Sequence, residues 1–270
     1  MYLGLGLRLG GLGVGPAFDA NALAYFTSAG ITNADQKKNI NSFVTGIKGL
    51  GLWSNMVAWP LRQDQNNNST STAKSLGGLG SYDFAFTGSP TVGTDGLTTN
   101  GSTQFGNATI GSANLRTYSI VYIQKVITPG ANFFAYGGGR SAGAGNFGIH
   151  VSSTGGRGLG VTQPNQNIAN SATSNGTGFY EVAFSGGATS FSAWTIGGNN
   201  SAISGNWTST SGSPSILNLA ITYNDFDATF GPLNAQFAFC AAFSTSLSKA
   251  QHDSVNTVYK TTIGTGLGLP

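Results

Sequence analysis

The loop at residues 224–227 carries the best candidate in the sequence for metal chemistry. The stretch TYNDFDATFGP places two carboxylates and one amide close together, at Asn224, Asp225 and Asp227. Oxygen donors of this kind are the ligands that Ca²⁺ prefers in proteins. The alternative is a polar turn, in which the same side chains accept hydrogen bonds from the nearby backbone. The sequence therefore offers one candidate calcium site, and we expect no other cofactor.

The acidic and nucleophilic side chains do not form a recognisable catalytic set. Glu181 lies in the strand-like stretch FYEVAF with no second acid two residues away, so we expect an exposed strand position and no glycosidase pair. Cys240, His150 and His252 lack the spacing of a zinc motif. Residues 143–148, GAGNFG, match the dinucleotide-binding glycine pattern but lead into a strand-like segment instead of a helix. No Gly-x-Ser-x-Gly elbow sits between a strand and a helix. We therefore expect no enzymatic activity.

Aromatic side chains offer a second kind of chemistry, because their faces can stack on sugars. Trp207 lies among small polar residues in SGNWTSTSG, which predicts exposure, and Tyr136 follows a run of aromatic residues. Both are candidate glycan-binding residues. Trp194 alternates with other apolar residues in TSFSAWTI, so we expect it to be buried in the core or between subunits.

Leucine alternates with glycine at both ends of the chain. The chain opens MYLGLGLRLGGLGVGP and closes GTGLGLP. Period-two leucines predict an extended strand with one apolar face, while glycine lets another backbone approach closely. Such a strand has little to pack on by itself, so we expect it to dock on a sheet edge of a neighbouring subunit. The candidate docking residues are Leu3, Leu5, Leu7, Leu9, Leu12, Leu267 and Leu269.

Helical signals surround a long series of short strands. Asp19 and Gly30 delimit one predicted helix, and a second helix is expected to start at Thr32. Ser248 and Gln251 form a capping box for a helix near the C-terminus. Between residues 81 and 245, strand-length apolar stretches separated by Gly, Asn, Ser and Pro predict an antiparallel sandwich or barrel. In the last stretch, AQFAFCAAF, Phe237, Phe239 and Phe243 are expected to share one face.

The predicted organisation has four parts. Residues 1–18 form the Gly/Leu-rich docking arm, and residues 19–62 form a short α-helical segment. Residues 63–80 are polar and low in complexity, which is typical of a linker. Residues 81–270 form the β domain with its C-terminal helix and tail.

Composition narrows the range of partners. Of 270 residues, 42 are glycine and 8% are charged, against about 25% charged residues in ordinary soluble proteins. The net charge is +3 without a basic cluster, so we expect no nucleic acid partner. One cysteine excludes an intrachain disulfide, which fits synthesis in a reducing cytoplasm. Neither a signal-peptide pattern nor an apolar run of about 18 residues is present, so we expect no membrane span.

Several stretches resemble known families. Residues 179–200, FYEVAFSGGATSFSAWTIGGNN, residues 234–255 and residues 96–110 resemble strand pairs of concanavalin A-like (laminin-G-like) jelly rolls. The preceding segment, residues 19–61, resembles the helical part that precedes such a jelly roll in tailed-bacteriophage virion proteins. The residues that carry this second resemblance are Ile40, Asn41, Phe43, Val44, Gly46, Lys48 and Trp53.

The resemblance implies a mainly β protein: a concanavalin A-like jelly-roll sandwich preceded by the Gly/Leu arm and the helical segment. It also implies calcium at a loop edge, a position that Asn224, Asp225 and Asp227 would fill. The implied function is a structural part of a phage virion, such as a tail fibre, that associates with itself, as a trimer, and with other virion proteins. The alternatives are a host-surface glycan-binding module and a capsid decoration or head-fibre protein. The chain would then reside in the virion after synthesis in the bacterial cytoplasm.

Overall fold

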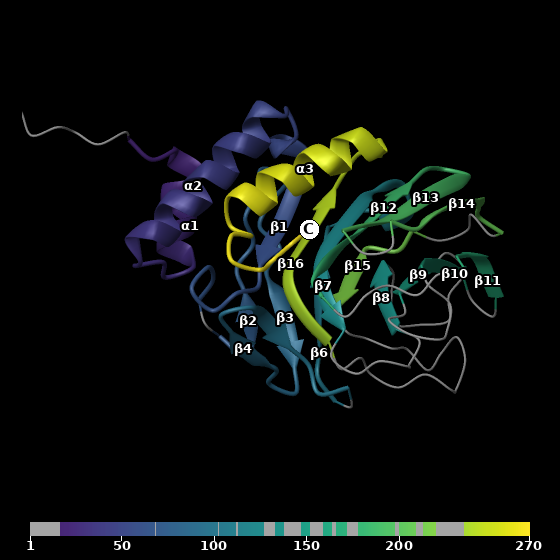
Figure 1. Ribbon diagram of the computed structural model, residues 1–270, viewed down its shortest axis with the longest axis horizontal. Helices are drawn as coiled ribbons and strands as arrows, with labels where there is room; N and C mark the ends of the chain where they lie inside the picture. The colour runs from purple at the N-terminus through teal and green to yellow at the C-terminus, as the bar shows by residue number, and fades with distance from the viewer. Residues whose placement is uncertain are drawn as a thin grey trace, which may run out of the picture.

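The computed structural model describes residues 17–67, 69–101, 103–111, 113–126, 133–137, 147–151, 159–163, 166–171, 178–197, 200–208, 213–219 and 235–270. Within these ranges the protein is mainly β. Two antiparallel sheets stack as a sandwich, and three α-helices lie on the outer face of one of them (Figure 1). This confirms the prediction of a mainly β, antiparallel sandwich.

The first sheet carries the helices on its outer face. In spatial order it contains β14 (Ala202–Asn206), β13 (Ser190–Ile196), β12 (Tyr180–Gly186), β7 (Ser119–Val126), β16 (Ala235–Phe243), β5 (Gly96–Thr98) and β4 (Thr91–Gly93). A further strand, β1 (Met56–Pro60), pairs with the second half of β16.

The second sheet forms the other layer of the sandwich. In spatial order it contains β11 (Gln166–Asn170), β10 (Leu159–Gln163), β9 (Phe147–Val151), β8 (Phe133–Gly137), β15 (Ile216–Leu219), β6 (Phe105–Thr109), β3 (Phe84–Thr87) and β2 (Thr72–Ala73).

The helices begin where side chains can cap them. The Asp19 side chain accepts a hydrogen bond from the backbone N–H of Asn21 and starts α1 (Ala20–Ser28), as predicted. The α2 helix (Ala34–Gly49) begins one residue later than expected, because the N-cap is Asn33 and not Thr32. The Asn33 Oδ1 atom accepts from two backbone N–H groups, at 2.9 and 3.0 Å. The predicted capping box at the start of α3 (Lys249–Thr261) is confirmed.

The central strands of the first sheet are buried on both faces. In β7, Ile120 and Tyr122 point into the core between the sheets, while Val121 and Ile123 point into a second core under the helices. The helices α1, α2 and α3 cover this second core (Figure 1). A strand buried on both faces reads as a nearly continuous apolar run, which is what the sequence has here.

The strand β16 differs from its predicted pattern. The pairing of β16 with β7 shifts between Phe237 and Phe239, and this irregularity turns the two rings to opposite faces. Phe237 therefore lies between the sheets, while Phe239 and Phe243 lie under the helices. A bulge inside a strand moves every later side chain to the other face, so strict alternation fails there.

The predicted linker is built into the sandwich. Residues 63–80 contain β2 and the buried side chains of Gln65, Asn66, Ala73 and Leu76. The preceding helical segment, residues 19–62, also supplies β1 to the first sheet. The polar composition of residues 63–80 reflects hydrogen bonding: the Asn66 Nδ2 donates to the carbonyls of Pro60 and Lys74.

Arg62 joins the N-terminal part of the chain to the segment that follows α3. Its Nη1 donates to the carbonyl oxygens of Ile263 and Thr265 at 3.0 and 2.9 Å, and its Nε donates to that of Thr94 at 2.6 Å. Gln65 is fully buried and adds a 2.6 Å bond from its Nε2 to Ile263. The chain following α3 is thus held by side chains about 200 residues earlier in the sequence.

The C-terminal Leu-Gly tail packs on its own chain. Leu267 is 8% exposed and belongs to the core under the helices, and Leu269 packs against the same core. Both are candidate docking residues: Leu267 is buried within its own chain, Leu269 is only partly buried, and docking through them stays a prediction. The N-terminal candidates Leu3, Leu5, Leu7, Leu9 and Leu12 lie outside the described residues.

None of the described helices has both the length and the apolar character that crossing a bilayer would require.

Replacing Arg62 with Met should destabilise the protein by about 1–3 kcal/mol, because the part-buried carbonyls of Thr94 and Thr265 lose this donor and that of Ile263 keeps only Gln65. Urea unfolding would measure the loss. Amide hydrogen exchange should show faster exchange in residues 263–267 than in the wild type.

The matched control is Lys38→Met, since the Lys38 side chain is 70% exposed and its pair with Asp35 lies in solvent. This variant should unfold like the wild type. Equal stability of the two variants would contradict the role given to Arg62.

Candidate functional site

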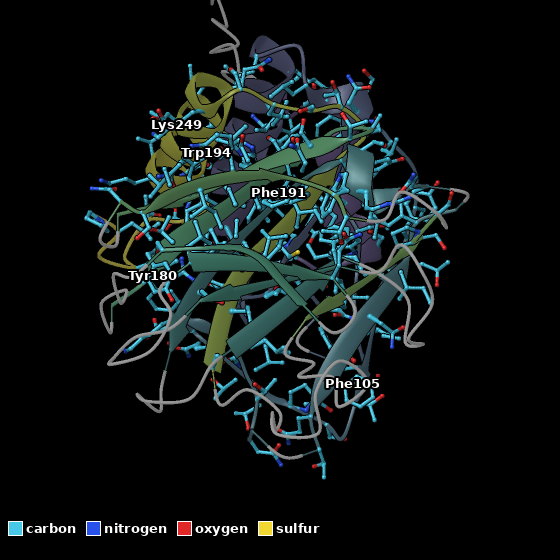
Figure 2. All side chains as sticks on the ribbon, turned by 90° about the vertical axis from the view of Figure 1, so that its right-hand side faces the viewer. Phe105, Tyr180, Phe191, Trp194 and Lys249 are labelled. Carbon is cyan, nitrogen blue, oxygen red and sulfur yellow. The ribbon has the colours of Figure 1, made fainter. Side chains whose placement is uncertain are left out.

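An open groove lies between the β12–β13 turn and the beginning of α3. Its volume is about 290 Å³, and five serines line it together with one indole ring and one lysine. Figure 2 shows Trp194 and Lys249 close together beside α3, with Phe191 farther along the sheet. The serines are Ser185, Ser190, Ser192, Ser246 and Ser248.

Close backbone contacts shape the turn that forms one wall of the groove. The N–H of Gly186 donates to the carbonyl of Tyr118 at 2.9 Å, and that of Gly187 donates to Ser190 at 2.7 Å. A Cβ atom at Gly186 would collide with the carbonyl of Arg116, so only glycine fits. The sequence SGGATS therefore makes a tight turn that brings the ends of β12 and β13 against α3.

Trp194 forms the aromatic wall. It lies on the outer face of β13, half-buried, and its ring centroid is 5.5 Å from that of His252 on α3. Its neighbour Phe191 points the other way, into the core between the sheets. Trp194 therefore lies outside the cores, because α3 covers only part of the outer face of β13, and burial between subunits stays a prediction.

Lys249 is the one charged residue among the described residues that line the groove. Its Nζ contacts both carboxylate oxygens of Asp253, at 2.7 and 3.0 Å, and both side chains are about half exposed. An exposed pair of this kind is weak and exchanges readily with other partners. Lys249 can therefore turn to an anionic group in the groove at little cost.

A buried hydrogen-bond network supports the floor of the groove. The Ser185 Oγ donates to the carbonyl of Leu247 at 2.6 Å, which uses its single proton. The Ser119 Oγ lies 2.9 Å from Ser185 Oγ and accepts from the N–H of Leu247 at 2.7 Å. The His252 Nε2 lies 2.8 Å from Ser185 Oγ. Because that oxygen has no proton left to give, His252 must carry its proton on Nε2 and donate.

This proton arrangement distinguishes Ser185 and His252 from a nucleophile and its base. A catalytic histidine must accept the serine proton, whereas here the serine gives its proton to a main-chain carbonyl. Ser185 is 5% exposed, and burial lowers the pKa of His252 to about 4. The two side chains fasten the start of α3 to β7 and β12, and so they fix the shape of the groove.

The position of Glu181 differs from the predicted one. It was predicted on the surface of its strand, but it is fully buried on the helix-facing side of β12, and neither carboxylate oxygen has a hydrogen-bond partner. Burial raises its pKa well above the usual range; nearby Asp253 adds to the rise and Lys249 opposes it. The helices covering this face are what bury it, and alternation within FYEVAF could not reveal them.

The two predicted glycan-binding residues, Trp207 and Tyr136, do not form one site. Trp207 is 7% exposed and packs with Phe147, Phe184 and Phe191 between the sheets, and its Nε1 donates to the carbonyl of Gly187. The prediction that Trp207 is exposed is therefore wrong, and its ring offers no face to a sugar. Tyr136 lies in β8 of the second sheet, the opposite layer from the groove.

The predicted calcium ligands Asn224, Asp225 and Asp227 lie outside the described residues, so that site stays a prediction. Within the described ranges, no group of three or more His, Cys, Asp or Glu side chains is placed to hold a metal ion.

The sequence contained partial signals for the groove. The capping box at Ser248 placed Lys249 and His252 on a helix, and the Gly-Gly pair predicted the turn after Phe184. Nothing local indicated that this helix start would pack against that turn.

No protein-family model matches the chain, and no curated protein matches it either. Solved structures do share its fold. The botulinum neurotoxin serotype D/C binding domain has a TM-score of 0.53 at 12% identity, over 76% of this chain and 52% of that one. A botulinum neurotoxin type C structure gives 0.53 at 11%, over 77% and 53%. The Trypanosoma rangeli sialidase in complex with sialic acid gives 0.55 at 12%, over 78% and 34%.

These similarities concern the fold. The chain spans about half or less of the length of each of these neighbours. Identities near 12% support a shared β-sandwich architecture and carry no residue-level correspondence.

Replacing His252 with Gln should change how stability depends on pH. Between pH 4 and 6.5 the unfolded chain binds a proton on His252 that the folded protein does not. Wild-type stability relative to His252→Gln should therefore fall as the pH is lowered through this window, by up to about 3 kcal/mol. Urea unfolding at several pH values would measure it.

Glu181→Gln is the matched variant of opposite sign. Folded Glu181 keeps its proton where the unfolded carboxyl has lost it, so wild-type stability relative to Glu181→Gln should fall as the pH rises above the usual range of a glutamate. The same sign of slope for both variants would contradict the burial assigned to the two side chains.

Proposed function

We propose that the protein is a glycan-binding module with a concanavalin A-like sandwich, and that the groove beside Trp194 is its sugar site. One observation carries the proposal: a half-buried indole ring, five serines and one lysine line the same open groove.

The chemistry of the groove suits a sugar. An indole face packs against the C–H groups of a pyranose ring, while hydroxyl groups exchange hydrogen bonds with its hydroxyls. Lys249 adds a positive charge, which favours a sugar that carries a carboxylate or a sulfate. Because Ser119, Ser185 and His252 fix the turn and the start of α3, the groove is formed before the ligand arrives.

The structural neighbours support the same class of ligand. Cell entry of botulinum neurotoxin type C depends on interaction with two ganglioside molecules, and the Trypanosoma rangeli sialidase was solved with sialic acid. The proposal carries glycan binding over to this chain and leaves out the neighbours' other activities. We propose binding without catalysis, because the proton of Ser185 is committed to a main-chain carbonyl.

We further propose that the module is a part of a tailed-phage particle, where it would contact the surface of the host. The support is the sequence resemblance of residues 19–61, including Ile40, Phe43 and Trp53, to the segment that precedes such jelly rolls in virion proteins. A self-associated form, as a trimer, would present several grooves at once, and several weak sugar contacts add up to firm attachment.

Glycan-array binding tests the groove. Trp194→Ala should lower binding about five- to thirtyfold, because loss of a stacked aromatic face is worth about 1–2 kcal/mol. Lys249→Gln should weaken binding to acidic glycans and leave binding to neutral ones unchanged.

The matched control is Trp53→Ala. Trp53 is also half-buried and has a lysine, Lys48, 5.3 Å from its ring centroid, but it lies in the front segment beside α2 and not in the groove. If the Trp194→Ala variant binds glycans as tightly as the wild type, or if both variants lose binding equally, the groove is not the sugar site. If the wild-type protein binds no glycan on the array, the proposed glycan-binding function is wrong.

Imaging of intact particles tests the virion proposal. Copies in threes or sixes at the tail would identify a fibre or adhesion device, and copies on the capsid lattice would identify a decoration or head-fibre protein. Absence of the chain from purified particles would contradict both.

A further inference from the structure

Among the strands that the structure describes, β14 is an edge of the first sheet. Among the described residues it pairs only with β13, over an unbroken register from Ala202 to Asn206. Residues 200–208 contain no charge and no proline, the two devices that usually protect an edge strand. The other described edges are poorer templates: β2 and β4 are very short, and the register of β11 with β10 is interrupted.

The backbone groups of β14 divide cleanly between its two sides. The Ser201 carbonyl accepts from the N–H of Thr195, and the Trp207 N–H donates to the carbonyl of Thr189, each at 2.9 Å. Since antiparallel pairs alternate, Ile203 and Gly205 also face β13. The N–H and C=O groups of Ala202, Ser204 and Asn206 therefore point away from the sheet, toward the open edge.

The apolar interior of the sandwich reaches this edge. Ile203 is partly buried and packs against the core between the sheets, and Ala169 of β11 does the same from the opposite layer. A Cβ atom at Gly205 would lie 3.6 Å from that of Ala169, so β14 and β11 face each other here. A strand added to β14 would place every second side chain beside Ile203, at the margin of this core.

We propose that β14 accepts residues 3–9 of a second copy of this chain as an added strand. In LGLGLRL the leucines recur at every second position, so all four can face the core beside Ile203 while Gly4, Gly6 and Arg8 face outward. Residues 1–16 lie outside the described residues and join the body at Ala17, next to α1. Figure 1 shows α1 and β14 at opposite ends of the molecule, so the donated segment comes from a second copy.

Sedimentation of the full-length protein tests the proposal. The wild type should associate with rising concentration over about 1–100 µM. Ser204→Pro should weaken this association at least about tenfold, because it removes the central outward N–H without removing a bond to β13. Ser204→Thr, which keeps that N–H, should associate like the wild type.

A double variant of the arm covers the case in which Ser204→Pro does not fold. Leu5→Asp combined with Leu7→Asp changes only the donated segment and should weaken association to the same extent. A wild type that stays monomeric, or association unaffected by Ser204→Pro and by the arm variant, overturns the proposal.

Disulfide trapping locates the contact. A copy with Gly4→Cys or Gly6→Cys, mixed with a copy carrying Ser204→Cys, should form a linked pair of chains. Leu23→Cys is the control acceptor, since Leu23 is 48% exposed on α1, and it should remain unlinked. The native Cys240 is buried and does not interfere. Linking to Leu23→Cys in place of Ser204→Cys would overturn the assignment of β14.

Discussion

Two neighbouring strands, β7 and β16, are buried on both faces, and most other features of the molecule depend on this. One face builds the core between the sheets, and the other builds the core under α1, α2 and α3. The helices are therefore part of the folded body, although α1 and α2 precede every described strand in the sequence and α3 follows the last one. The bonds from Arg62 and Gln65 to Ile263 and Thr265 join these distant pieces directly.

When helices cover the outer face of a sheet, any polar side chain on that face loses its contact with water and needs a hydrogen-bond partner within the protein. Ser119, Ser185 and His252 bond to one another and to both main-chain groups of Leu247, which leaves only the His252 Nδ1 atom of this network without a partner. The Glu181 carboxyl group has no such partner. An unpaired buried carboxyl costs stability whenever it ionises, so this position is a weak point of the fold at high pH.

The groove arises where the helical cover ends. The start of α3 reaches β12 and stops short of hiding Trp194 on β13, which leaves an indole ring beside five serines and Lys249. Beyond β13 the sheet ends in the uncharged edge of β14. The same half of the sandwich thus holds a polar groove suited to sugars and an open edge suited to another strand, and the two use different groups: side chains in the groove, and main-chain N–H and C=O groups at the edge.

The sequence by itself determined the local structure. Asp19 and the Ser248–Gln251 box predicted two helix starts, glycine and asparagine clusters separated the strands, and many short strands predicted a sandwich. These features depend on neighbours within a few residues, so local sequence is enough. Only the tertiary structure decided which faces are buried. Glu181 and Trp207 became interior residues, Trp194 stayed only half-buried, and Phe237 turned away from Phe239 at a bulge. Burial depends on what another part of the chain brings to a face, and a strand pattern cannot show whether its polar face meets water or a helix from the far end of the sequence.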